Sequence, residues 1–233
     1  QSGGLQSYWK FDAVSGSTAT DSSGNNQNGT VTNAVESTDV PFADFPGNDA
    51  PTFTTHDVST SADGALSVYA EDVDDDGDMD VLSASFDDNK IIWYENDGSE
   101  SFSAHVISTT ANGAFSVHAA DVDGDGDVDV LSASYNDSKI TWYENDGSES
   151  FSTHVISSSA SGARSVHAAD VDGDGHMDVL SASYNDNKVA WYKNDGSENF
   201  TEQVISTSAS LAHSVHAADV NGDGDMDVLS AST

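Results

Sequence analysis

Short apolar runs separated by polar clusters follow one another along most of the chain. In one representative stretch the runs are 116–120, 130–134, 139–144 and 151–156, with Gly, Asp, Asn and Ser between them. Runs of β-branched and aromatic residues bounded by turn-forming residues predict β-strands. No segment shows a sustained 3.6-residue apolar period, so helices are not expected. The pattern predicts an all-β chain.

The same pattern returns every 49 residues. The motif Asp-Val-Asp-x-Asp-Gly-x-x-Asp begins at Asp72, Asp121 and Asp170, and it returns at Asp219 with Asn221 at its third position. Four strands in a repeat of this length are typical of one blade of a β-propeller. We therefore expect a propeller-like array of about four blades, each a four-stranded antiparallel sheet.

The two ends of the array are irregular. The last repeat contains only its first two strands, whereas aromatic segments at 8–11 and 53–56 resemble later strands of a blade. The simplest interpretation is that N-terminal strands complete the last blade. Within one chain this closes a ring, whereas between chains it generates a filament or a larger ring. We divide the chain into a strand and linker segment, 1–51, which is a possible donor strand, and the repeats, 52–233.

Each repeat carries a loop rich in carboxylates. Alternate Asp residues direct their oxygens to one point, a Gly at the sixth position permits the sharp turn, and the seventh residue is expected to contribute its backbone oxygen. Such a set of oxygen ligands suits Ca²⁺ better than Mg²⁺ or a transition metal. The predicted loop residues are Asp72, Asp74, Asp76, Asp78 and Asp80; Asp121, Asp123, Asp125, Asp127 and Asp129; Asp170, Asp172, Asp174, His176 and Asp178; and Asp219, Asn221, Asp223, Asp225 and Asp227.

The charge of the chain supports this interpretation. The formal net charge is -35, and 20 of the 41 acidic residues lie in the four loops, where they repel one another if no cation is present. We therefore expect about four calcium ions. A halophile-type acidic surface is the alternative, but it spreads its carboxylates over exposed faces. Binding to nucleic acid or to an anionic membrane surface is disfavoured by repulsion.

Composition also bears on the location of the protein. The chain has no Cys, no apolar run of membrane-spanning length, and Gln rather than Met as its first residue. We interpret it as a mature, processed product without membrane insertion. Calcium loops of modest affinity are filled best at the millimolar calcium found outside cells. An extracellular, secreted or cell-surface protein is expected.

The loops differ from those of helical calcium-binding modules. An EF-hand requires Glu at the twelfth loop position and flanking helices, but Ser83 and its equivalents occupy that position within strand-like runs. The repeats from about residue 52 instead resemble the FG-GAP or VCBS-type, integrin-α-like propeller repeats. This resemblance implies calcium in the loop between the first two strands of each blade. The family's propellers usually have seven blades, so about four repeats favour a small propeller or assembly between chains.

Other features allow several interpretations. Residues 5–34 resemble the start of a LamG or concanavalin-like domain, although too little chain follows for that domain. Tyr69, His118, His167 and His216 occupy equivalent positions, and the imidazoles either bind a metal or pack in a central channel. Trp93, Trp142 and Trp191 either stack on sugars or pack between sheets.

No catalytic constellation interrupts the repeats. Catalysis normally requires an asymmetric arrangement of groups, and here the carboxylate motif recurs without a break. We therefore expect a non-enzymatic, calcium-stabilised structural or adhesive protein that associates with itself into a filament or ring. The alternative is a carbohydrate-binding, lectin-like module or a non-catalytic fragment of a polysaccharide-degrading enzyme, with a glycan or another cell-surface ligand as its partner.

Overall fold

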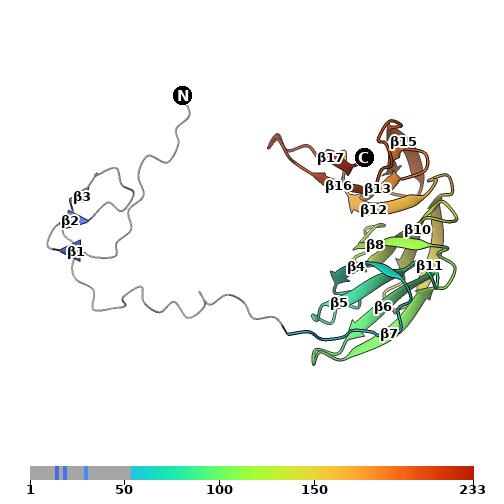
Figure 1. Ribbon diagram of the computed structural model, residues 1–233, viewed down its shortest axis with the longest axis horizontal. Coiled ribbons are helices and arrows are strands. Elements are labelled where there is room, and N and C mark those ends of the chain that lie inside the picture. Colours follow the sequence, from blue (N-terminus) through green and yellow to red (C-terminus); the bar gives the residue numbers. More distant parts are fainter. Residues whose placement is uncertain (1–13, 16–17, 20–28, 31–53) are drawn as a thin grey trace. The chain divides into compact units, whose positions relative to one another are not determined.

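The computed structural model divides the chain into two compact units, Gln1–Thr55 and His56–Thr233. It describes residues 54–233 and, in the first unit, the backbone of three short strands that form one antiparallel sheet (Figure 1). These strands are β1 (Val14–Ser15), β2 (Thr18–Ala19) and β3 (Gly29–Thr30). The strand expected at 8–11 lies outside the described residues. Of the strand expected at 53–56, residues 54–56 are described and do not form a strand, so that expectation was wrong for them.

The second unit consists of successive antiparallel sheets (Figure 1). Three sheets have four strands each, in the order of the sequence, and a fourth has two. The strands are β4 (Ala65–Glu71), β5 (Asp80–Ser85), β6 (Lys90–Asn96) and β7 (Phe102–Ser108); β8 (Ala114–Ala120), β9 (Asp129–Ser134), β10 (Lys139–Asn145) and β11 (Phe151–Ser157); β12 (Ala163–Ala169), β13 (Asp178–Ser183), β14 (Lys188–Asn194) and β15 (Phe200–Ser206); and β16 (Ser214–Ala218) and β17 (Asp227–Ala231). Residues 54–233 contain no helix, and therefore none of membrane-spanning length.

This arrangement confirms the predicted all-β, propeller-like array. Each four-stranded sheet is one blade, and the first strands of successive blades, β4, β8, β12 and β16, lie next to one another. The observed strands extend the predicted ones by one or two residues at several ends. Completion of the two-stranded last blade by N-terminal strands concerns residues that the structure does not describe.

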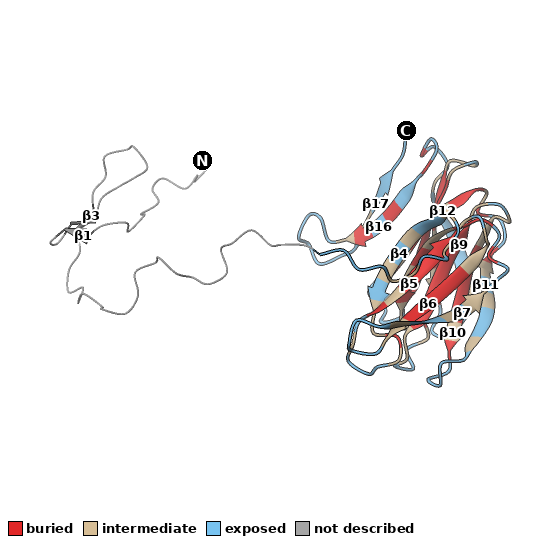
Figure 2. Cartoon of the chain, turned by 60° about the horizontal axis from the view of Figure 1, so that its bottom comes forward, coloured by how far each residue is buried: buried red, intermediate tan, exposed pale blue. Residues whose placement is uncertain are grey.

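The hydrophobic core lies between neighbouring blades, where the central strands are buried on both faces (Figure 2). In the first interface, Leu82 and Trp93 of one blade belong to the same buried cluster as Val117 and Tyr143 of the next. Burying a side chain of this size stabilises the fold by about 1.5–3 kcal/mol. Because each blade covers the next in this way, a single blade cannot bury both of its apolar faces alone.

Hydrogen bonds from backbone amides to serine hydroxyls also connect the blades. The amide of Val117 donates to the hydroxyl of Ser67 at 3.3 Å, one blade earlier. The same bond recurs from Val166 to Ser116 at 3.4 Å and from Val215 to Ser165 at 3.2 Å. A β-bulge near the start of each complete first strand shifts the register at this place. The repeated Ser of the first strand is therefore a structural link between blades.

Candidate metal centre

The carboxylate loop of each repeat is a hairpin between the first and second strands of a blade. In the second blade, Asp121 accepts the amide of Gly124 at 2.7 Å through one oxygen and that of Gly126 at 3.1 Å through the other. Equivalent bonds to the first Asp occur in the third and fourth loops, and in the first loop Asp72 accepts the amides of Asp76 and Gly77. Gly126 has φ 102°, a conformation that side-chain-bearing residues rarely adopt. The hydrogen bonds of the first Asp and the positive φ of the sixth Gly together hold the loop in a tight turn.

The ninth Asp anchors the loop to the interior of the blade. Asp80, Asp129 and Asp178 are fully buried in their strands. Asp129 accepts the amide of Val122 at 2.9 Å and that of Asn145, at the end of the third strand, at 2.8 Å. Asp80 accepts the corresponding amides and also the indole Nε1–H of Trp93, at 2.8 Å. These bonds fix the side-chain orientation of the carboxylates before any ligand binds.

Three carboxylates converge in each of the first three loops. They come from the first, third and ninth positions, and their closest oxygens lie within 4.8 Å of one another. The three groups are Asp72, Asp74 and Asp80; Asp121, Asp123 and Asp129; and Asp170, Asp172 and Asp178. A set of converging carboxylate oxygens on a rigid hairpin can hold a hard cation. The sequence predicted these residues together with two further positions of each loop.

The fifth and seventh positions have other contacts. Asp76, Asp125 and Asp174 are not members of these close groups, and each accepts the amide two residues further along the chain at 2.8–3.0 Å. The seventh side chain, Asp78, Asp127 or His176, lies against the Gly of the following Asn-Asp-Gly turn. This side chain is not a member of the converging groups, so the backbone oxygen of the seventh residue is its candidate ligand.

The fourth loop has the same backbone frame with one different side chain. Asp219 and Asp227 accept the loop amides as their equivalents do, and Asn221 accepts the amide of Asp223 at 2.8 Å. The amide group of Asn221 retains an oxygen but lacks a charge, and both Asp219 and Asn221 are exposed. This loop therefore offers two carboxylates where the other three offer three.

Burial and the charges of neighbouring carboxylates raise the pKa values of several loop Asp residues. Burial raises the pKa of Asp129 to about 7, against the lowering effect of its hydrogen bonds to the Asn145 and Val122 amides. Burial also raises the pKa of Asp123, and the charges of Asp125, Asp121 and Glu144 raise it further. Asp74 shows the same effects in the first loop. Negative charges that are held together in this way favour a bound cation.

Each of the first two loops is connected to the following blade by one Asn residue of that blade. The side-chain amide of Asn145 donates to the carbonyl of Val73 in the preceding loop at 3.3 Å and to that of Val128 in its own loop at 3.2 Å. Asn194 repeats this with Val122 at 3.0 Å and Met177 at 3.1 Å. Sequence analysis missed this role. The signal was the presence of Asn at the same position of every Trp-Tyr strand.

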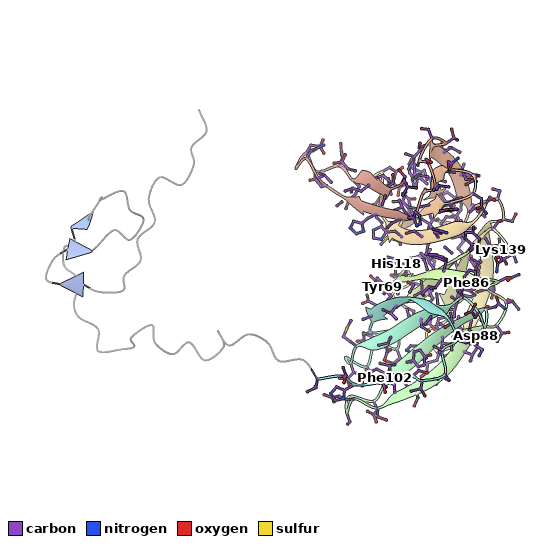
Figure 3. All side chains as sticks on the ribbon, viewed as in Figure 1. Tyr69, Phe86, Asp88, Phe102, His118 and Lys139 are labelled. Carbon is purple, nitrogen blue, oxygen red and sulfur yellow. The ribbon has the colours of Figure 1, made fainter. Side chains whose placement is uncertain are left out.

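The histidines and tryptophans of the repeats lie elsewhere. The rings of Tyr69, His118, His167 and His216 form a line across the first strands, with centroids 4.5, 4.7 and 4.3 Å apart, and Figure 3 shows Tyr69 beside His118. Within residues 54–233, these histidines do not form a group of three that converges on one point, so the structure gives no support to a transition-metal site. Trp93 and Trp142 are 1% exposed and pack between blades.

Comparisons with known proteins agree with the repeat pattern. The model of the FG-GAP-like repeat family matches residues 72–132, 121–181 and 170–230. A comparison with curated protein sequences gave no match.

Two solved structures are similar to part of this chain. One is an Agrocybe aegerita lectin that recognises non-reducing terminal N-acetylglucosamine, with 18% identity over 69% of this chain and 45% of the lectin, at a TM-score of 0.49. The other is the V. cholerae biofilm matrix protein Bap1, with 21% identity over 72% of this chain and 28% of Bap1, at a TM-score of 0.44. This chain therefore matches less than half the length of each. The three family matches together span residues 72–230, and the chain belongs to the FG-GAP-like repeat family.

Proposed function

We propose that this chain is an extracellular, calcium-stabilised structural or adhesive repeat protein without enzymatic activity. The observation that carries the proposal is the threefold recurrence of a buried ninth Asp beside two further carboxylates on a rigid hairpin. Oxygen-only ligand sets of this kind favour calcium, and millimolar extracellular calcium fills loops of modest affinity. The equal form of the three groups favours a repeated structural role over a single reactive centre.

In the second loop, Asp121, Asp123 and Asp129 would hold the ion. Bound calcium supplies the positive charge that the crowded carboxylates lack. Asp129 also accepts the amide of Asn145, so the site is continuous with the third strand and with the contact to the first loop. Occupation of a loop is therefore expected to stabilise two neighbouring blades.

Removal of calcium tests this function. Binding to the folded state alone stabilises it by RT ln(1 + [L]/Kd) per site, about 2.7 kcal/mol at a hundredfold excess over Kd. We expect the melting temperature to fall by more than 10 °C when millimolar calcium is replaced by EDTA, and to recover when calcium, but not magnesium, is restored. An unchanged melting temperature in EDTA contradicts the proposal.

We further propose self-association of the chain. Val68 of the first blade is 71% exposed, whereas its equivalents Val117, Val166 and Val215, each covered by a preceding blade, are 4% exposed. On the last blade, Leu229 is 42% exposed, whereas the equivalent leucines of the other blades are fully buried. The outer faces of the first and last blades therefore expose the same kinds of apolar residue that pack together between neighbouring blades within the chain. N-terminal strand exchange, as considered from the sequence, is the second route to association.

Light scattering separates the two routes. Association through the outer faces is expected to be lost in Val68→Asp and retained when residues 1–50 are removed. Strand exchange predicts the opposite pattern. A wild-type chain that remains monomeric at high concentration with calcium contradicts self-association by either route.

A lectin-like function is the second candidate, and one surface favours it. At the ends of the hairpins opposite the carboxylate loops, half-buried aromatic rings follow one another across the blades, with centroids 6.2–6.4 Å apart. The rings are Phe86, Phe115, Tyr135 and Tyr184. Partly exposed aromatic rings are suited to stacking on sugars. Binding on a glycan array that is lost in Tyr135→Ala supports this candidate, and an array without signal argues against it.

A further inference from the structure

The third loop differs from the first two in the residue that faces it from the third strand of its blade. In the first two blades this residue is Glu95 and Glu144, and in the third blade it is Lys193. The ammonium group of Lys193 contacts the carboxylate of Asp172 and lies 3.0 Å from that of Asp174. The third loop therefore already has a cation of the protein beside its carboxylates.

A second exchange accompanies the first. Glu95 and Glu144 each pair with a His of the fourth strand, His105 and His154, with 2.7 Å between the carboxylate oxygen and the Nε2 atom. The position equivalent to these histidines in the third blade is Gln203, which carries no charge. The position beside the third loop thus lacks both the carboxylate and its His partner.

The two arrangements affect the loops in opposite directions. Glu95 and Glu144 place a carboxylate at the position that faces the first and second loops. In the third loop, the ammonium group of Lys193 instead places a positive charge beside Asp172 and Asp174. The formal charge of the position facing the loop changes by two units between Glu and Lys.

We propose that Lys193 is a built-in counter-ion that makes the third loop less dependent on calcium and a weaker calcium site than the first two. This inference rests on the proposed calcium function and divides the sites into two classes. The first and second loops fill at the lower calcium concentration and lose more stability than the third when calcium is removed. The third loop keeps one positive charge beside Asp172 and Asp174 in both conditions.

Charge substitutions at this position test the inference by calorimetric calcium titration of the full chain. Lys193→Gln removes one unit of charge and Lys193→Glu removes two and restores the residue of the other blades. In a water-like dielectric, one unit charge about 6 Å from a divalent ion changes its affinity about tenfold. The third-loop affinity is expected to rise in the order Lys, Gln, Glu by about tenfold per step. Three equal affinities overturn the inference.

A reciprocal variant and a second measurement separate this role from ordinary packing. Glu144→Lys places the same ammonium group at the second loop, where it is expected to lower calcium affinity about a hundredfold. Lys193→Glu is expected to lower the melting temperature in EDTA and to enlarge its rise on calcium addition. Loss of a merely structural ion pair would lower the melting temperature equally in both conditions, which would contradict the inference.

Failure of the calcium function itself gives a different result. If the wild-type chain shows no calcium binding at any loop, the proposed function fails before the variants are compared. If the wild type binds calcium at all loops with one affinity, and Lys193→Glu leaves that affinity unchanged, the function stands and the counter-ion role of Lys193 is wrong.

Discussion

The buried ninth Asp of the first loop provides a sharp test of how the loop is held in the blade. The carboxylate of Asp80 accepts three hydrogen bonds, from the amides of Val73 at 3.1 Å and Asn96 at 2.8 Å and from Nε1 of Trp93 at 2.8 Å. Val73 and Trp93 are 3% and 1% exposed, so water does not replace the carboxylate when it is removed. Asp80→Ala leaves these two donors without an acceptor.

The expected magnitude follows from those donors. A buried donor without a partner costs about 1–3 kcal/mol, so Asp80→Ala is expected to destabilise the fold by about 2–6 kcal/mol even in EDTA. Asp80→Asn retains one acceptor oxygen in the same shape and is expected to lie between wild type and Asp80→Ala. The matched control is Asp227→Ala in the fourth loop. The amide that Asp227 accepts belongs to Val220, which is 64% exposed and can bind water instead, so a loss below about 1 kcal/mol is expected there.

Urea denaturation in EDTA, followed by circular dichroism, measures all four proteins, with the slope of the transition checked for each. Working without calcium separates the hydrogen bonds of the carboxylate from its role as a ligand. If Asp80→Ala and Asp227→Ala lose the same stability within about 0.5 kcal/mol, the inferred anchoring role of the ninth Asp is refuted.

Three further substitutions test other parts of the array. Gly126→Ala is expected to destabilise the fold by about 1–3 kcal/mol through backbone strain alone, because φ is 102° and the added methyl group meets no atom within 4 Å. Asp75 has φ 60° at a position where the other loops have Gly. The reverse exchange Asp75→Gly is therefore expected to raise the melting temperature slightly. Burial, with a smaller effect of the charges of His167 and His216, lowers the pKa of His118 from 6.5 to about 4. The unfolded chain then binds the proton first, so stability falls as pH decreases from about 6.5 to 4, by about 3 kcal/mol for this group. His118→Gln is expected to flatten that decline in acid melting curves, and an unchanged pH dependence would contradict the assignment.

The strands and the loop carboxylates were predictable because their signals are local. Alternating apolar residues, turn-forming clusters and the 49-residue period all lie within one repeat. The strand ends were less predictable. Asp129 begins a strand and Asn145 ends one, yet both residues are typical of turns. Their inclusion depends on bonds between residues 16 apart, which no local pattern contains.

The contacts between blades were not predictable from one repeat. Asn145 reaches a carbonyl 72 residues earlier, and the amide of Val117 reaches a Ser 50 residues earlier. Such pairs follow from how one blade is laid against the next, which the sequence of a single blade does not specify. The exchange of Glu for Lys at position 193 is visible in the sequence, but its consequence needs the distance to Asp172 and Asp174.

Two kinds of side-chain contact stabilise the first three loops. An Asn of the following blade donates to the carbonyl of Val73 in the first loop and of Val122 in the second. Among residues 54–233, no side-chain amide bonds to the equivalent carbonyl of Val171 in the third loop. Lys193 stands beside this third loop and binds its carboxylates from within the same blade. Stability in a repeat array is the sum of each repeat and its neighbour contacts, so the Lys193 contacts belong to the stability of a single blade and the Asn contacts to that of the interface between blades.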